Sequence, residues 1–213
     1  MDSAITVIFQ LIILIFSVVI HEVSHGLAAN ALGDPTAKYA GRLTLNPFKH
    51  LDPIGSILLP LASFFLGGII IGWAKPVPYN PYNLQVKNRD LGSALVGIAG
   101  PGSNILLAVI FGLMVRASLI WTPLLGGISG AVLEIMASIA VINLVLAVFN
   151  LVPIPPLDGS KVLFSVLPYG WEGVRMFLER FGFILLLAFV FYFSHWILPI
   201  VSFLFRLISG GGL

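Results

Sequence analysis

The sequence predicts an all-α, polytopic membrane protein with about four to six transmembrane helices, one re-entrant segment and a short β-hairpin-like loop. Of its 213 residues, 58% are hydrophobic and only 9% are charged, whereas soluble domains carry roughly 25% charged residues. Several apolar runs reach the ~20 residues that a helix needs to cross a bilayer. No internal repeat or soluble domain interrupts them, so we expect one integral-membrane domain over residues 1–213.

Composition also restricts the chemistry. The formal charge is +2, but in a membrane protein Lys and Arg report topology before they report an anionic partner, so nucleic acid is not expected to bind. The chain contains no cysteine, which excludes disulfides, cysteine zinc sites and thiol nucleophiles. Any metal must therefore be bound by histidines and carboxylates.

Five apolar segments divide the chain. They are residues 4–31, 54–74, 92–118, 128–151 and 176–208. Asp2 precedes the first segment in place of the basic leader of a signal peptide, so we expect that segment to remain as a mature helix. The last segment is long enough to bend or break, and Pro199 is the expected place.

Two polar stretches flank the second apolar segment. Gly33, Asp34 and Pro35 should end the first helix, and the partial alternation over residues 38–45 predicts a short hairpin within the loop 33–52. Residues 72–81 are too rich in proline for a helix and should be extended or turned.

The strongest motif is His21-Glu22-Val23-Ser24-His25, near the end of the first apolar segment. Residues at i and i+4 share one face of a helix, so both imidazoles can reach one zinc ion while Glu22 lies beside the metal-bound water. Zinc lowers the pKa of that water toward ~7, and a carboxylate can then take its proton. The alternative is a hydrogen-bonded polar cluster between helices, although such groups within a membrane are costly unless they are paired or metal-bound.

A catalytic zinc usually has three protein ligands, and Asp158 is the best third candidate. It lies in a segment, residues 150–160, that is interrupted by three prolines, and broken backbone at membrane depth survives only where it is buried or lines a wet cavity. The alternative is that Asp158 caps a helix beginning near Gly159. The other acidic residues are expected at solvated or interfacial positions: Asp2, Asp34, Asp52, Asp90, Glu134, Glu172 and Glu179.

The remaining buried polar candidates have simpler interpretations. Asn104 and Asn143 are expected to form interhelical hydrogen bonds, and for Asn150 the same interpretation stays open beside a functional one. His50 and His195 have no second ligand at metal spacing, so we exclude them from the site.

Several motifs together resemble the site-2 protease family of intramembrane zinc metalloproteases. They are His21-Glu22-x-x-His25, Ala99-Gly100-Pro101-x-x-Asn104, Asn150-x-x-Pro153-x-x-x-Leu157-Asp158-Gly159, Leu45-Asn46-Pro47-x-x-His50-x-Asp52-Pro53-x-Gly55 and Gly72-Trp73-Ala74-Lys75-Pro76-Val77-Pro78. The resemblance spans nearly the whole chain and favours the compact members without a PDZ domain. It implies one Zn²⁺ bound by His21, His25 and Asp158, with Glu22 as catalytic base and Asn150 polarising the substrate or stabilising the oxyanion.

The function implied is an intramembrane endopeptidase, acting on membrane-spanning or membrane-anchored proteins within the lipid bilayer. Regulatory anchors and signal-peptide remnants are examples of such substrates. The alternative is a membrane metal-ion transporter with a His and Asp site, and a third reading is an inactive binder of membrane helices. Neither the particular substrate nor the oligomeric state is encoded in these motifs.

Shared ligation by His25 and Asp158 constrains the topology. Both helix ends must face the same side, so the helix at 128–151 must run parallel to the first, and segment 54–74 is expected to be re-entrant. Nine of the eleven Lys and Arg residues then share one side, leaving Arg116 and Arg206 opposite. Because cytoplasmic loops are enriched in these residues, we predict a plasma or inner membrane protein with a cytoplasmic-side active site about 10–15 Å below the surface. An exposed edge at 38–45 could pair with an unwound substrate.

Overall fold

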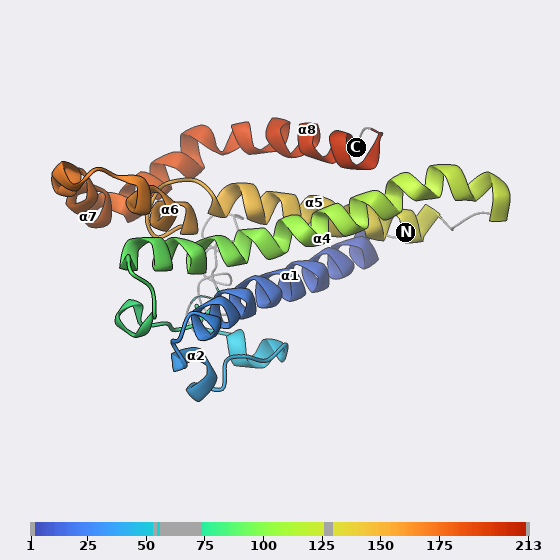
Figure 1. Ribbon diagram of the computed structural model, residues 1–213. Helices are drawn as coiled ribbons and strands as arrows, with labels where there is room; N and C mark the ends of the chain where they lie inside the picture. The colour runs from blue at the N-terminus through green and yellow to red at the C-terminus, as the bar shows by residue number, and fades with distance from the viewer. Residues whose placement is uncertain (1–2, 53–54, 56–73, 126–129, 212–213) are drawn as a thin grey trace.

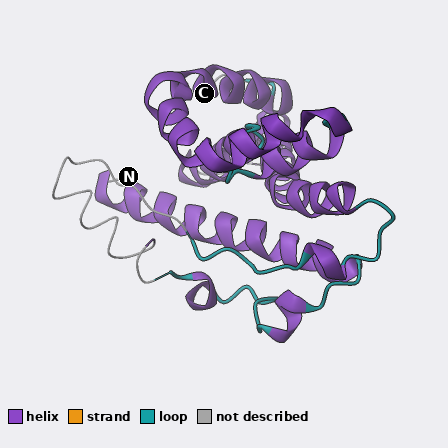
Figure 2. Ribbon diagram, turned by 90° about the vertical axis from the view of Figure 1, so that its left-hand side faces the viewer, coloured by secondary structure: helices purple, strands orange, loops and turns teal. Residues whose placement is uncertain are grey.

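The computed structural model describes residues 3–52, 55, 74–125 and 130–211, and these residues form helices and loops without a strand (Figures 1 and 2). Four of the helical stretches are long and apolar enough to cross a membrane. They cover Ile5–Ala31, Arg89–Ser118, Gly130–Asn150 and Glu172–Ser209. The predicted fold class, an all-α polytopic membrane protein, is confirmed.

Three long helices build the centre of the bundle: α1 (Ser3–Ala31), α4 (Arg89–Leu125) and α5 (Gly130–Asn150). His21 bonds to Asn104 of α4, and His25, one turn later on α1, bonds to Val96, which is eight residues earlier on α4. Helices α1 and α4 are therefore antiparallel. Helix α5 folds back along α4 and so runs parallel to α1 (Figure 1). Shared ligation of a metal by His25 and Asp158 requires this direction. The end of α1 and the start of α4 lie at the same end of the bundle.

The segment predicted at 176–208 is a pair of helices. Helix α7 (Glu172–Ala188) passes through a π-helical turn at Phe189–Phe193 and a 3₁₀ turn at Ser194–Trp196 into α8 (Ile197–Ser209). The break thus lies upstream of Pro199, which corrects the prediction. Pro199 is in the first turn of α8, where a missing N–H costs little because the first N–H groups of a helix have no intrahelical acceptor.

Helices α4 and α5 form the middle of the molecule, with α1 on one side and α8 on the other (Figure 1). The largest apolar core lies between α4, α5 and α8. Its buried members are Ala108, Ala140, Leu144, Ile197, Val201 and Phe205. This packing leaves the other side of α4 and α5 free to receive α1, and the site lies there.

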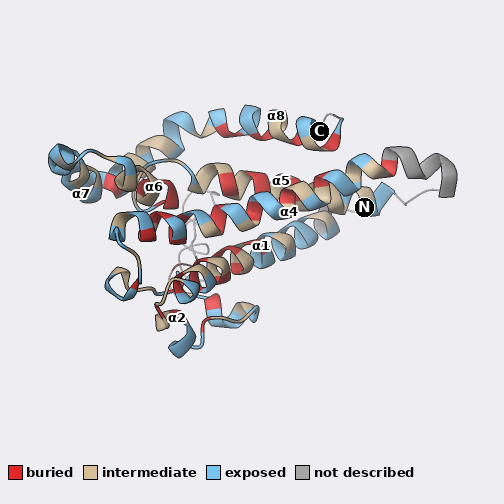
Figure 3. Cartoon of the chain, in the orientation of Figure 1, coloured by how far each residue is buried: buried red, intermediate tan, exposed pale blue. Residues whose placement is uncertain are grey.

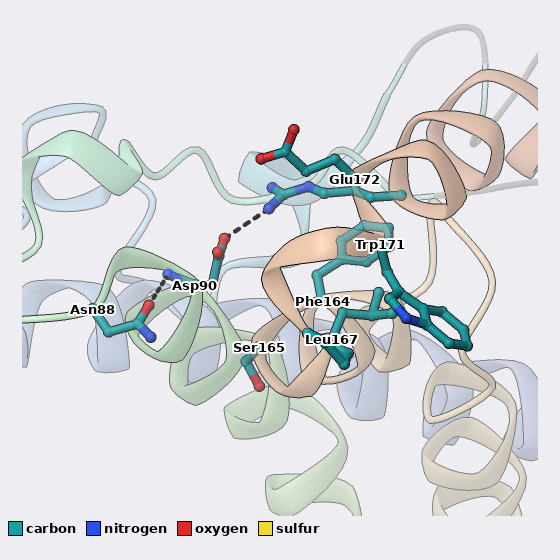
Figure 4. A pocket seen from close by; sticks show the side chains of 9 residues that line it. Asn88, Asp90, Phe164, Ser165, Leu167, Trp171 and Glu172 are labelled. Atoms are coloured by element: carbon teal, nitrogen blue, oxygen red, sulfur yellow. Dashed lines mark hydrogen bonds and ion pairs between the residues drawn. The ribbon is translucent and has the colours of Figure 1, made fainter.

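Helix α7 carries little buried surface of its own, with Gly182 as its buried residue (Figure 3). It is joined to the start of α4 by an ion pair, 3.0 Å between Arg175 Nη1 and Asp90 Oδ1, drawn as a dashed line in Figure 4. The ion pair borders a cavity of about 290 Å³ that also includes Trp171 and Glu172. No histidine lines this cavity, so it is not the metal site.

The hairpin predicted at 38–45 is not present, because the described residues 33–52 contain no strand. Instead they form α2 (Thr36–Tyr39) and a 3₁₀ turn at Pro47–His50. The Asp34 carboxylate accepts hydrogen bonds from the Thr36 backbone and hydroxyl, and Gly41, with φ +63°, turns the chain away after α2. These local side-chain bonds compete successfully with a strand ladder, and the proposed substrate-pairing edge is removed with the hairpin.

Residues 74–83 run beside the C-terminal half of α1 and end in a 3₁₀ turn at Pro81–Asn83 (Figure 2). Residues 74–80 contain neither helix nor strand, as their prolines lead us to expect of a non-helical segment. The predicted re-entrant segment 54–74 lies outside the described residues, apart from Gly55 and Ala74.

Candidate metal centre

His21 and His25 lie on the buried face of α1. Residues 5–16 of this helix are exposed or half-buried, and fully buried positions begin at Ser17 (Figure 3). The two histidines keep only 5% and 7% of their surface. Helical spacing therefore turns both imidazoles toward α4 and α5, as the motif predicts.

Asp158 is brought beside them by a tight turn after α5. Asn150 ends α5, and the chain folds back through turns in which Leu157 N–H donates to Ile154 O at 2.9 Å. Gly159 allows the closest approach, because a Cβ there would lie 2.6 Å from Val152 O and still nearer to Leu151 O. Asp158 is the first residue of α6 (Asp158–Val166), whose N-cap is Leu157, so the alternative role of Asp158 as an N-cap is not observed.

Three ligand-type atoms converge at this point. Asp158 Oδ2 lies 3.1 Å from His21 Nε2 and 3.0 Å from His25 Nε2. The two Nε2 atoms are 3.1 Å apart. In a tetrahedral zinc site with bonds of ~2.0–2.1 Å, donor atoms are separated by about 3.3 Å, so the triangle has nearly the dimensions of a zinc site.

The opposite ring nitrogens decide which atoms face the centre of this triangle. His25 Nδ1 lies 2.7 Å from Val96 O, and His21 Nδ1 lies 2.6 Å from Asn104 Oδ1. Both partners are acceptors, because Asn104 uses its amide nitrogen to donate to Asn143 Oδ1 at 2.8 Å. Each neutral imidazole therefore carries its proton on Nδ1 and directs the Nε2 lone pair inward.

The centre of the triangle is consequently lined by lone pairs alone. Two imidazole nitrogens and a carboxylate oxygen repel one another at 3.0–3.1 Å unless a cation lies between them. This donor set suits Zn²⁺, and the hydrogen bonds on Nδ1 are the outer contacts that fix metal-binding histidines. The residues thus fit a zinc ion with a fourth position left open.

Lys161 compensates the carboxylate charge. Its Nζ donates to Asp158 Oδ1 at 2.9 Å, which leaves Oδ2 to face the histidines. Burial alone would lower the pKa of Lys161, but the charge and hydrogen bond of Asp158 raise it above its ordinary value. The same ion pair favours the charged form of the Asp158 carboxyl. The pair is therefore ionised at neutral pH.

Glu22 lines the same pocket as these groups. One oxygen of its carboxylate and one ring nitrogen from each of His21 and His25 all lie within 4.8 Å of one another. Its Oε2 accepts a hydrogen bond of 2.7 Å from Val77 N–H. The pocket measures about 210 Å³. It is lined by His21, Glu22, His25, Pro76, Val77, Tyr79, Asn150, Pro156, Asp158 and Lys161.

Asn150 lines this pocket, and its amide nitrogen donates to Leu146 O of its own helix at 2.9 Å. His50 is buried but bonds to Thr44 O, and His195 packs against Trp196. Neither joins the cluster.

Four contributors to the site were not predicted as such. Asn104 was expected to bond between helices, and it does, but its partner is a candidate ligand. No sequence signal pointed to Lys161. Gly100 and Val77 lie in the motifs that resemble the site-2 protease family, but the resemblance gave neither of them a role. Only packing identifies these three.

Comparison with known proteins agrees with this chemistry. The family model described as "Peptidase family M50" matches residues 126–189. A Bacillus subtilis (strain 168) protein named "Putative zinc metalloprotease YwhC" is 41% identical over 181 residues, covering 84% of this chain and 78% of the relative.

More distant relatives are longer. A protein of Mycolicibacterium smegmatis named "Putative zinc metalloprotease Rip2" is 32% identical over 149 residues, and its namesake in Mycobacterium tuberculosis (strain H37Rv) is 33% identical over 147 residues. The matches cover 70% and 69% of this chain but only 53% and 52% of the relatives. No solved structure matches the chain. The spanning helices and these relatives together show that the chain is a multi-pass membrane zinc metalloprotease of peptidase family M50, the site-2 protease family.

Proposed function

We propose that this metalloprotease is an endopeptidase that hydrolyses peptide bonds in or near the transmembrane segments of other membrane proteins. The observation that carries the proposal is the position of Glu22, a carboxylate in the same pocket as three converging ligand atoms. His21, His25 and Asp158 would hold the zinc. Regulated cleavage of membrane anchors and clearance of signal-peptide remnants are two uses of this activity.

When bound, zinc supplies a Lewis acid that makes a water molecule nucleophilic near neutral pH. Glu22 would accept the proton of that water and later return it to the leaving amine. Lys161 keeps Asp158 ionised and places a positive charge at the pocket wall. Asn150 would donate its amide to the substrate carbonyl or to the oxyanion after exchanging its bond to Leu146.

The depth of the site supports a substrate within the bilayer. His25 and His21 precede the end of α1 at Ala31 by six and ten residues, or about 9–15 Å along the helix. We propose that the metal-side end faces the cytoplasm in the plasma or inner membrane, since nine of the eleven basic residues belong to that side in the predicted topology.

Glu22→Gln tests this function in the full-length protein reconstituted in lipid with a single-span reporter protein. The amide keeps the size of the side chain but cannot take a proton, so cleavage should fall by about 100-fold or more while zinc content stays unchanged. Undiminished cleavage would remove the mechanism. The transport alternative, which the family relationship does not favour, requires zinc flux across vesicles containing the variant.

A further inference from the structure

A loop that supplies no candidate metal ligand reaches the site through a backbone group. Residues 74–83, here called the strap, run along α1, and Val77 N–H donates to Glu22 Oε2 at 2.7 Å across a separation of 55 residues. Hydrogen bonds to an ionised carboxylate are about twice as strong as neutral ones. The contact therefore joins the strap to the proposed catalytic base.

The strap is anchored on both sides of this contact. Before Val77, Lys75 N–H donates to His50 O at 2.9 Å, and Lys75 O accepts from Arg42 Nη2 at 2.7 Å. After it, Asn80 N–H donates to Asp34 Oδ2 at 2.6 Å. Val77 is thus held between two fixed points, neither of which involves a ligand.

Prolines stand on both sides of the donor in this contact. Pro76 and Pro78 flank Val77, have no N–H, and restrict the backbone to extended conformations. The Val77 amide is therefore the sole backbone donor among residues 76–78. Its side chain is buried at 6% exposure and packs against the position of Gly26 on α1. Both features hold the amide in one place.

We propose that the Val77 N–H is a positioning group for the catalytic base. By binding Oε2, it fixes the orientation of the Glu22 carboxylate and leaves the other oxygen to take the proton from water. A free glutamate would lose side-chain rotamer freedom at each turnover, whereas this one is oriented in advance. The inference rests on the proposed function of Glu22.

Two substitutions separate the amide from the side chain. Val77→Pro removes the N–H at a position already flanked by prolines, whereas Val77→Ala removes side-chain packing and keeps the N–H. Each variant is reconstituted at full length with the single-span reporter, and zinc per chain, kcat and KM are measured. We expect kcat of Val77→Pro to be about ten-fold or more below that of Val77→Ala, with equal zinc content and similar KM.

A kcat of Val77→Pro equal to or above that of Val77→Ala would overturn the proposal. A higher kcat would mean that the amide restrains the base. Failure of the proposed function is recognised separately, because Glu22→Gln would then cleave like the unmodified protein.

A second measurement does not depend on proteolysis. Hydrogen exchange of a peptide covering residues 75–80 should show one amide that exchanges faster in Glu22→Ala than in the unmodified protein, because its acceptor is gone. Glu22→Gln, which keeps an acceptor oxygen, should retain most of that protection. Identical exchange in the unmodified protein and Glu22→Ala would show that the contact does not form, and the proposal would fail.

Discussion

At the scale of single residues, the site depends on how closely a backbone can approach two imidazoles. Gly100 of α4 is buried directly against them, since a Cβ at this position would lie 2.5 Å from His25 Cε1 and 2.7 Å from His21 Cε1. Real Cβ atoms do not approach other atoms so closely. The absence of a side chain at Gly100 therefore allows α4 to present its acceptors, Val96 O and Asn104 Oδ1, to the rings.

Gly100→Ala should displace the imidazoles and weaken zinc binding by about 10- to 100-fold, the range seen when groups that orient metal ligands are disturbed. Gly102→Ala is the matched control, because a Cβ there meets nothing within 4 Å and alanine favours the helix by about 1 kcal/mol. Competition with a chelator of known zinc affinity measures both. Equal zinc affinity in the two variants would contradict this role of Gly100.

At the scale of elements, the junction after α1 determines where the strap lies. Gly33, at φ +99°, ends the helix, and Asp34 follows with 0% exposure. Its carboxylate binds Thr36 next to it and, from the strap, Asn80 N–H at 2.6 Å and Asn83 Nδ2 at 3.0 Å. One carboxylate therefore fixes α2 and the strap to the end of the helix that carries both histidines.

Asp34 makes this junction sensitive to pH. Burial alone would raise the pKa of Asp34, but the hydrogen bonds from Thr36, Asn80 and Asn83 outweigh it and lower the pKa below 3.8. A carboxyl group whose pKa is lower in the folded state than in the unfolded state stabilises the fold at pH values above its unfolded-state pKa. That contribution is lost as the pH falls through the folded-state pKa. Asp34→Asn cannot ionise, so it should be less stable at pH 7 and should lose less stability than the unmodified protein below about pH 4.

Thermal unfolding in detergent between pH 7 and pH 3 measures this difference. Parallel curves for Asp34→Asn and the unmodified protein would show that Asp34 does not contribute the acid-dependent part.

At the scale of the whole molecule, the arrangement of α1, α4 and α5 decides which residues share a side of the membrane. Helix α1 ends where α4 begins, and α5 ends beside α1, so both histidines and Asp158 belong to one end of the bundle (Figure 1). The start of α5 and the end of α8 lie at the other end. If the basic residues orient the chain as expected, the metal end is cytoplasmic.

Single cysteines can test this orientation, because the chain has none of its own. Ala40 follows directly after α2 and Gly130 is the first residue of α5, and both are exposed. Helix α2 and the start of α5 lie at opposite ends of the bundle (Figure 1). Gly130→Cys should react with an impermeant maleimide in intact cells, and Ala40→Cys should react only after the membrane is opened. The reverse pattern would place the site on the outer side and contradict the charge argument.

The whole-molecule features were the most predictable from sequence, because they follow from repeated local properties. Long apolar runs give spanning helices in any context where backbone groups must bond internally. The hairpin at 38–45 was wrong for the opposite reason. Its weak alternation competed with one strong local contact, the Asp34 carboxylate bonded to Thr36, which favours a helical turn.

By itself, the sequence determined the membrane helices and the pairing of two histidines with a glutamate on one of them, since helical period and ligand chemistry are properties of short segments. It also predicted Asp158 as a ligand, and the structure brings Asp158 Oδ2 within 3.1 Å of both histidines. Only the tertiary structure decided how these groups are completed. Asn104 orients His21 across 83 residues, and Val77 reaches Glu22 across 55. Such contacts depend on where whole helices and loops pack, and the strap finds the base through a backbone N–H that every residue except proline possesses.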